Sequence, residues 1–177
     1  LRWSKIYKLD LENNQLKSLP ESVVNCKYLN EIKLRGNHIT SLPTSLAELT
    51  TYYFNIDISH NGLTEVPEVL GKIKQLRTLN LSHNQLTSLP DELSKAQQLY
   101  YLRAANNQIT ELPIDFHLMV KLSSIDLSYN QIKALPDQLP PAFQDSNVYR
   151  GTFSLYGNPI SVDDQKQYML KFKGLRF

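Results

Sequence analysis

The sequence predicts an α/β solenoid, in which each turn of the chain contains one short strand and returns through turns and short helices. Three observations support this prediction. A segment typified by LNLSHNQLTSLP recurs along the chain, its asparagines recur at a nearly constant spacing, and six of the nine prolines occupy one place in it. Self-similarity at a period of about 20 to 50 residues is the signature of repeat architectures.

The recurring asparagines define a period of about 23 residues, which lies in the range of solenoid repeats. They are Asn14, Asn37, Asn61, Asn84, Asn107, Asn130 and Asn158, and the interval widens clearly only before the last of them. The recurring prolines are Pro20, Pro43, Pro67, Pro90, Pro113 and Pro136. We therefore predict a single domain over residues 1–177, with repeats at about 6–28, 29–52, 53–75, 76–98, 99–121 and 122–149, and a terminal repeat and cap at 150–177.

The spacing of apolar residues predicts the strand within each repeat. Leu79 and Leu81 are two residues apart and therefore point to the same face of an extended strand. Stacking strands about 4.8 Å apart would bury these leucines in a continuous ladder, which one repeat alone cannot form. The opposite wall of the core is predicted to come from pairs on the return segments, namely Leu46 and Leu49, Leu70 and Ile73, and Phe116 and Val120.

The polar and proline columns are predicted to serve the scaffold. An asparagine amide can satisfy backbone groups where the chain leaves the strand, and asparagine tolerates strained backbone better than most residues. The asparagine column is therefore interpreted as a structural ladder. A proline such as Pro90 cannot donate a backbone hydrogen bond, so it is predicted to end strand pairing.

The pattern L-x-x-L-x-L-x-x-N-x-L-x-x-L-P resembles the leucine-rich-repeat family over residues 6 to about 160. The resemblance implies a horseshoe with parallel strands on its concave face and turns and short helices on its convex face. It also implies that function is protein–protein interaction through the concave face. The ending G-N-P-I-S resembles that of leucine-rich-repeat domains in bacterial effectors, including ubiquitin ligases, although their shorter repeats carry a double L-P step that is absent here.

The C-terminal segment predicts a capping helix. Ser161 followed by Asp164 has the spacing of a capping box, in which the two residues satisfy the first backbone N–H groups of a helix. Val162, Met169 and Phe172 can share one helical face, so the helix is predicted to lie over the last repeat. At the other end the chain enters its first repeat almost directly. We therefore expect it to be part of a longer protein, or Trp3 to cover part of this edge.

Composition predicts a binding protein without a cofactor or a metal. The formal net charge is +2, with basic residues matched by acids, so nucleic acid is not predicted as a partner. The chain has one cysteine, Cys26, and lacks an apolar run of about 18 residues, so membrane insertion is not predicted. These features favour a cytoplasmic protein, or one in host-cell cytoplasm if it is a secreted bacterial effector.

Partner binding is predicted on the exposed positions of the strands. Tyrosine and arginine dominate interface hot spots, and they gather in the later repeats, whereas Asp10, Glu12, Glu31 and Lys33 give the early repeats a charged surface that could select a partner. The alternative is that these are ordinary solvated strand residues. The predicted partner-binding residues are Arg35, His60, His83, Tyr101, Arg103, Asp126, Tyr129 and Tyr156.

Two features admit more than one interpretation. His60 and His83 occupy equivalent places in adjacent repeats, which fits a stacked polar pair, a pH-dependent contact or, with Asp57, part of a metal site.

The sequence contains no motif of a catalytic site, and Cys26 is interpreted as a structural thiol. The alternative function is substrate recognition for a larger enzyme, such as an effector ubiquitin ligase or a kinase, whose catalytic part lies outside this chain. A structural role is the third hypothesis, with the tail residues Lys166, Lys171, Lys173 and Arg176 docking to a neighbour.

Overall fold

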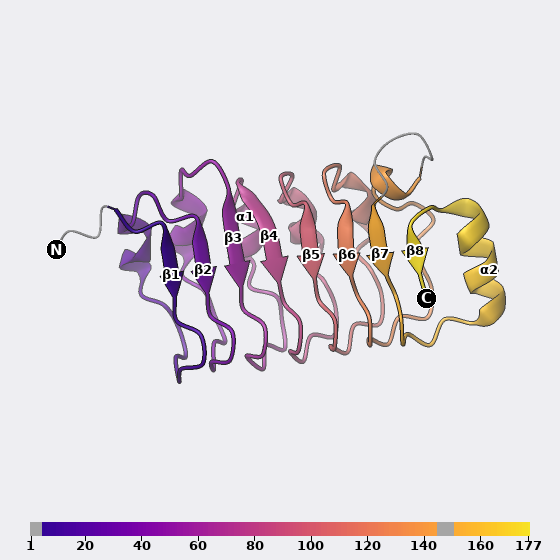
Figure 1. Ribbon diagram of the computed structural model, residues 1–177, viewed down its shortest axis with the longest axis horizontal. Helices are drawn as coiled ribbons and strands as arrows, with labels where there is room; N and C mark the ends of the chain where they lie inside the picture. The colour runs from indigo at the N-terminus through magenta and orange to yellow at the C-terminus, as the bar shows by residue number, and fades with distance from the viewer. Residues whose placement is uncertain (1–4, 145–150) are drawn as a thin grey trace.

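The computed structural model describes residues 5–144 and 151–177, and Trp3 lies outside this part of the chain. Eight parallel strands lie side by side in one open sheet, in the order in which they occur along the chain (Figure 1). The α/β solenoid predicted from the repeats is therefore confirmed. The strands are β1 (Lys8–Asp10), β2 (Glu31–Lys33), β3 (Phe54–Asp57), β4 (Leu76–Asn80), β5 (Tyr101–Arg103), β6 (Ser124–Asp126), β7 (Thr152–Ser154) and β8 (Leu175–Arg176).

The core is a ladder of apolar side chains that runs the length of the sheet. Leu79 pairs with Leu102 and Leu102 with Ile125, and all three are buried. The return segments form the opposite wall, where Leu46 and Phe116 are also fully buried. The prediction was wrong only for Val120, which lies just after a short helix and is 55% exposed.

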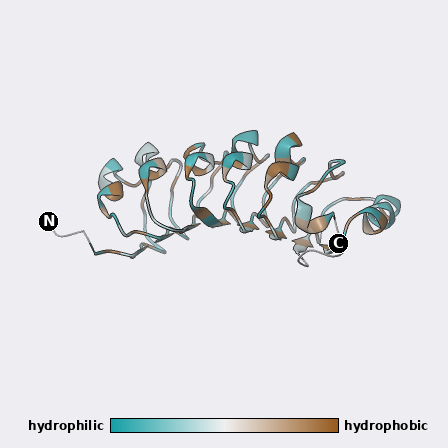
Figure 2. Ribbon diagram, turned by 90° about the horizontal axis from the view of Figure 1, so that it is seen from above, coloured by the Kyte–Doolittle hydropathy of each residue, from teal (hydrophilic) through white to brown (hydrophobic). Residues whose placement is uncertain are grey.

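The return segments carry short helices on the side of the sheet opposite its exposed face (Figure 2). Most are 3₁₀ helices, whose tight turn fits the few residues available in each repeat. They are η1 (Glu21–Asn25), η2 (Thr44–Glu48), α1 (Val69–Lys72), η3 (Asp91–Lys95), η4 (Ile114–Leu118) and η5 (Pro141–Phe143).

Four of the repeated prolines directly precede one of these helices, namely Pro20, Pro43, Pro90 and Pro113. The prediction that the prolines end strand pairing was wrong. β4 ends at Asn80, well before Pro90. Pro90 instead precedes η3 in an extended conformation, and its carbonyl accepts a hydrogen bond from the backbone N–H of Leu93 at 3.0 Å. Proline suits this place because its fixed φ directs the chain and its missing N–H would have no partner before the first turn.

The C-terminal end contains the helix that the sequence predicted and an additional strand that it did not predict. Helix α2 (Val162–Lys171) begins at Ser161, whose hydroxyl accepts a hydrogen bond from the backbone N–H of Asp164 at 3.1 Å. The apolar face predicted for this helix was wrong, because Val162 and Met169 are exposed and only Phe172, just beyond the helix, is buried. The chain then forms β8, which pairs with β7 and covers the last rung of the core.

Candidate functional site

The sheet presents to solvent a row of side chains at the last position of each of the strands β1 to β7. The strand register places one residue of each strand beside its equivalent in the next strand. Because the flanking residues point into the core, these side chains form a continuous column. We use the name exposed sheet face for the exposed side chains of the strands together with those of the three residues that follow each strand. The column consists of Asp10, Lys33, Asp57, Asn80, Arg103, Asp126 and Ser154.

A second column follows each strand and has a left-handed backbone conformation. This conformation suits glycine and asparagine but costs other residues roughly 1–2 kcal/mol. The residue with positive φ precedes each ladder asparagine, so the strained backbone predicted for the asparagines themselves lies one position earlier. The column consists of Asn13, Gly36, His60, His83, Asn106, Tyr129 and Gly157.

Three members of this column occupy a backbone conformation that their residue types rarely adopt. His60, His83 and Tyr129 have φ values of 55°, 56° and 55°, where the chain elsewhere uses asparagine or glycine. A non-glycine residue in this region persists only when its surroundings hold it there, and such residues gather at functional sites. The conformation itself recurs in every repeat, and the role of these three residues in partner binding stays a prediction.

The asparagine column joins neighbouring repeats through hydrogen bonds. In the interior rung, Asn84 Nδ2 donates to the carbonyl of Leu81 in its own repeat at 2.8 Å and to that of Ile58 in the preceding repeat at 3.1 Å. Asn84 Oδ1 accepts from the backbone N–H groups of Asn61 and Leu63 at 3.1 and 3.0 Å. One buried amide therefore satisfies backbone groups of two repeats at the point where each strand ends.

The same pattern extends along the ladder with one exception at its first rung. Asn14 is exposed, and within the described residues its side chain donates only to the carbonyls of Leu11 and Glu12 in its own repeat. The amides that hydrogen-bond to both their own and the preceding repeat are Asn37, Asn61, Asn84, Asn107, Asn130 and Asn158.

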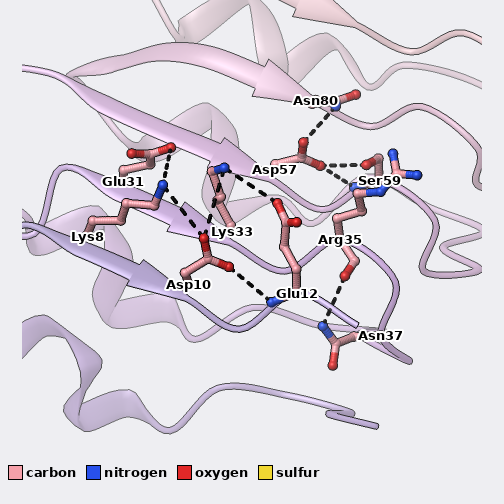
Figure 3. A network of polar contacts seen from close by, with 10 residues as sticks. All are labelled: Lys8, Asp10, Glu12, Glu31, Lys33, Arg35, Asn37, Asp57, Ser59 and Asn80. Atoms are coloured by element: carbon pink, nitrogen blue, oxygen red, sulfur yellow. Dashed lines mark hydrogen bonds and ion pairs between the residues drawn. The ribbon is translucent and has the colours of Figure 1, made fainter. Parts of the chain in front are cut away.

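The charged side chains of the first two strands are largely paired with one another. Lys8 lies 3.6 Å from Asp10 and 3.7 Å from Glu31, and Lys33 lies 4.0 Å from Asp10 and 3.7 Å from Glu12 (Figure 3). Two lysines and three carboxylates give this group a formal charge of 2 − 3 = −1. Because exposed pairs of this kind are worth little to stability, their main effect is to neutralise much of the charged surface that the sequence predicted as a selector of the partner.

The two arginines of the predicted site are not part of such pairs. Within the described residues, no ion pair or hydrogen bond is formed by the guanidinium groups of Arg35 and Arg103, and both residues are exposed. The carboxylate of Asp126 is instead engaged, because it accepts hydrogen bonds from the hydroxyl and the backbone N–H of Ser128 at 2.7 and 3.1 Å. Among the described residues, no carboxylate therefore competes with a partner for these two guanidinium groups.

Two of the predicted tyrosines form one aromatic cluster. The rings of Tyr129 and Tyr156 meet edge to face, with their centroids 5.4 Å apart, and both residues are more than half exposed. The bare backbone of Gly157 makes room for them, since a Cβ there would lie 2.7 Å from a ring carbon of Tyr129. Rings held in this way lose little conformational freedom when a partner binds.

Tyr101 does not join that cluster. It begins β5, whereas Tyr129 lies beyond the end of β6, so the two side chains stand at opposite ends of the strands. Tyr101 instead contacts the ring of Tyr100, at a centroid distance of 4.6 Å. Sequence reasoning grouped the tyrosines by repeat number, but it missed Tyr100 and the depression that this ring lines at the start of the strands.

The two histidines stack as parallel rings. The centroids of His60 and His83 are 4.0 Å apart, and the rings are inclined by 14°. In the described part of the chain, these residues do not belong to a group of three or more histidine, cysteine, aspartate or glutamate side chains that could hold a metal ion. Partial burial lowers the pKa of His60, the neighbouring His83 and Arg35 lower it further, and Asp57 opposes the change.

This lowered pKa predicts a loss of stability in acid. The folded state binds a proton at His60 less tightly than the unfolded chain does. The contribution of neutral His60 to stability is therefore complete above about pH 6.5, the pKa of histidine in the unfolded chain. It is lost as the pH falls through that value toward the lower pKa of His60 in the folded state. We expect His60→Asn, which places a residue suited to left-handed backbone there, to flatten the pH dependence of the unfolding free energy between about pH 8 and 5.

Urea titrations at a series of pH values would measure this effect. His38→Asn, at an exposed position, is the matched control and should leave the profile unchanged. Identical pH profiles for the parent and His60→Asn would show that the histidine stack does not affect stability.

Cys26 is buried and unbonded, as expected for a structural thiol. The longest helix of the described residues is α2, with ten residues, and none of the helices there has the length and apolar character needed to cross a membrane.

Comparison with known proteins identifies the repeat. A family profile described as "Leucine rich repeat" matches residues 55–109 and 75–132. The chain is 40% identical to chaoptin of Drosophila melanogaster over 76 residues and 33% identical over 72 residues to a mouse protein described as leucine-rich repeat and calponin homology domain-containing protein 1. These matches cover 43% and 41% of this chain but only 6% and 10% of the two relatives.

A solved structure has the same fold. It is a leucine-rich-repeat protein of Leptospira interrogans, with a TM-score of 0.55 and 24% sequence identity over 96% of this chain and 54% of that one.

Proposed function

This chain is a leucine-rich-repeat protein, and we propose that it binds a protein partner through the exposed sheet face. The observation that carries the proposal is the combination on one surface of freely accessible arginines, the Tyr129–Tyr156 cluster and the His60–His83 stack. Leucine-rich-repeat domains generally mediate protein–protein interaction and are typically not enzymes, which agrees with this assignment.

The chemistry of these residues suits a protein surface. The two exposed tyrosines supply large, rigid contact area at low entropic cost, and Arg103 lies one strand before them with its guanidinium group unpaired within the described residues. The paired charges on the first two strands (Figure 3) form a polar region beside this surface and contribute to selectivity more than to affinity. We therefore place the main contact on the later strands and a polar border on the earlier ones.

A binding experiment with a triple variant tests the proposal. Arg103→Asn, Tyr129→Asn and Tyr156→Ser insert residues that the chain itself carries at equivalent places in other repeats, so the backbone and the ladder should be preserved. We expect proteins captured from a lysate by the parent to be lost, and the affinity of a captured partner to fall by roughly thirtyfold or more, because one hot-spot residue is worth about 2 kcal/mol.

A control variant on the helical side, Lys95→Ala with Gln97→Ala, changes exposed residues far from the sheet face and should retain binding. Circular dichroism would show that all three proteins are folded. Equal affinities for the parent and the triple variant, or loss of binding in the control alone, would refute the assignment of the partner to the exposed sheet face.

A further inference from the structure

A depression lies at the edge of the sheet where the chain enters strands β3 to β6, away from the tyrosine cluster of the exposed sheet face. Its volume is about 380 Å³, and it is lined by tyrosines, amides and two basic residues. We call it the strand-start depression. Its lining residues are Tyr52, Tyr53, Gln75, Arg77, Gln98, Tyr100 and Lys121.

One inserted residue lies on the β3 side of this depression. The interval from Asn37 to Asn61 is longer by a single position than the interval between the ladder asparagines on either side of it. The chain absorbs the difference just before β3, where Phe54 pairs with Leu76 and the register shifts between Phe54 and Asn55. As a result Tyr52 is fully exposed, and Tyr53 is held beside it by a hydrogen bond from Asn30 to its hydroxyl at 3.3 Å.

The charged side chains that line the depression are all basic. Arg77 and Lys121 are its charged lining residues, and neither forms an ion pair within the described part of the chain. Lys121 Nζ donates to Gln98 Oε1 at 2.5 Å, which holds the ammonium group over the depression. The first two strands differ in this respect, because their lysines are matched by carboxylates. An anionic ligand would therefore find at this edge cations that no protein carboxylate already occupies.

The aromatic residues add a second requirement on the ligand. Tyr52 and Tyr53 border the depression on one side and Tyr100 on the other, so a bound chain would contact ring faces as well as charges. Tyrosine rings bind apolar and aliphatic groups and leave a hydroxyl for polar contacts.

We propose that the strand-start depression binds an acidic peptide segment in which carboxylates alternate with apolar residues. A carboxylate would lie between Arg77 and Lys121, and the neighbouring apolar side chains would pack against the three tyrosines. A nucleic-acid strand fits less well, because it requires a track of cations along its phosphates and this depression supplies two. The Tyr100–Tyr101 ring contact joins the depression to the exposed sheet face, so one partner could occupy both.

Fluorescence anisotropy with a defined probe tests this site. The probe is a short fluorescein-labelled peptide of alternating glutamate and leucine, and the control probe replaces each glutamate by lysine. We expect the parent protein to bind the acidic probe and not the basic one, with affinity falling as salt rises. Charge reversal at both cations, Arg77→Glu with Lys121→Glu, should weaken binding by at least roughly tenfold.

Lys95→Glu is the matched control, because it reverses an exposed cation in η3, outside both the depression and the sheet face. It should leave the affinity for the acidic probe unchanged, and Tyr52→Ser, at a fully exposed position, should weaken it severalfold. This site and the sheet-face site can fail independently, because the two sets of variants change different residues.

Several results would overturn the proposal. They are absence of binding of the acidic probe at millimolar protein, equal binding of both probes, retention of affinity in the Arg77→Glu, Lys121→Glu variant, and preferential binding of a labelled oligothymidylate.

Discussion

Phe153→Ala is expected to lower the free energy of unfolding by about 3–5 kcal/mol, because it removes a large, fully buried ring from the core. Phe153 lies in β7 between Ile125 of β6 and Leu175 of β8. Its ring also contacts those of Phe143 and Phe116, at centroid distances of 5.4 and 6.2 Å. The cavity would be bordered by groups from four different segments, none of which can close it without breaking its own contacts.

Urea unfolding monitored by circular dichroism would measure this change. Leu170→Ala, in α2, is the control, since Leu170 is 84% exposed and its loss should change the unfolding free energy by less than about 0.5 kcal/mol. Because each repeat contacts mainly its neighbours, hydrogen exchange should show the largest loss of protection in β6 to β8. A change below about 1 kcal/mol would mean that the C-terminal rungs are packed differently.

Asn84→Ala is expected to cost about 1–3 kcal/mol, because it leaves two buried carbonyls and two buried N–H groups without their side-chain partner. Asn14→Ala is the matched control within the same column. Asn14 is exposed, and water can replace its hydrogen bonds to Leu11 and Glu12, so its loss should be nearly neutral.

Asn84→Asp separates the two functions of the ladder amide. The aspartate keeps the oxygen that accepts from Asn61 and Leu63 but loses the NH₂ group that donates to Leu81 and Ile58. We expect it to be destabilising at neutral pH, where a buried carboxylate would also face two carbonyl oxygens. Unchanged urea midpoints for Asn84→Ala and Asn84→Asp would refute the ladder as a source of stability.

Only those features of the candidate site that follow from the repeat period and from residue type could be predicted. The strand period places Arg103 and Asp126 side by side, and the register confirms that arrangement. The pairing of Lys8 with Asp10 and Glu31 could not be predicted, because it depends on where long side chains lie in three dimensions. The position of Tyr101 could not be predicted either. The sequence grouped it with Tyr129, whereas the two side chains stand at opposite ends of the strands.

The sequence by itself determined the scaffold, because a short repeat with apolar positions at every second place admits one way of burying them, as a stack of parallel strands. It also determined the start of α2, since the capping contact between Ser161 and Asp164 is local. Only the tertiary structure decided the rest. The register of the strands, β8 and the strand-start depression depend on how one repeat meets the next. A single extra residue before β3 accompanies Tyr52 and Tyr53 at a depression that Tyr100, Arg77 and Lys121 of later repeats also line. Such features depend on distances between repeats, which the order of residues within one repeat does not specify.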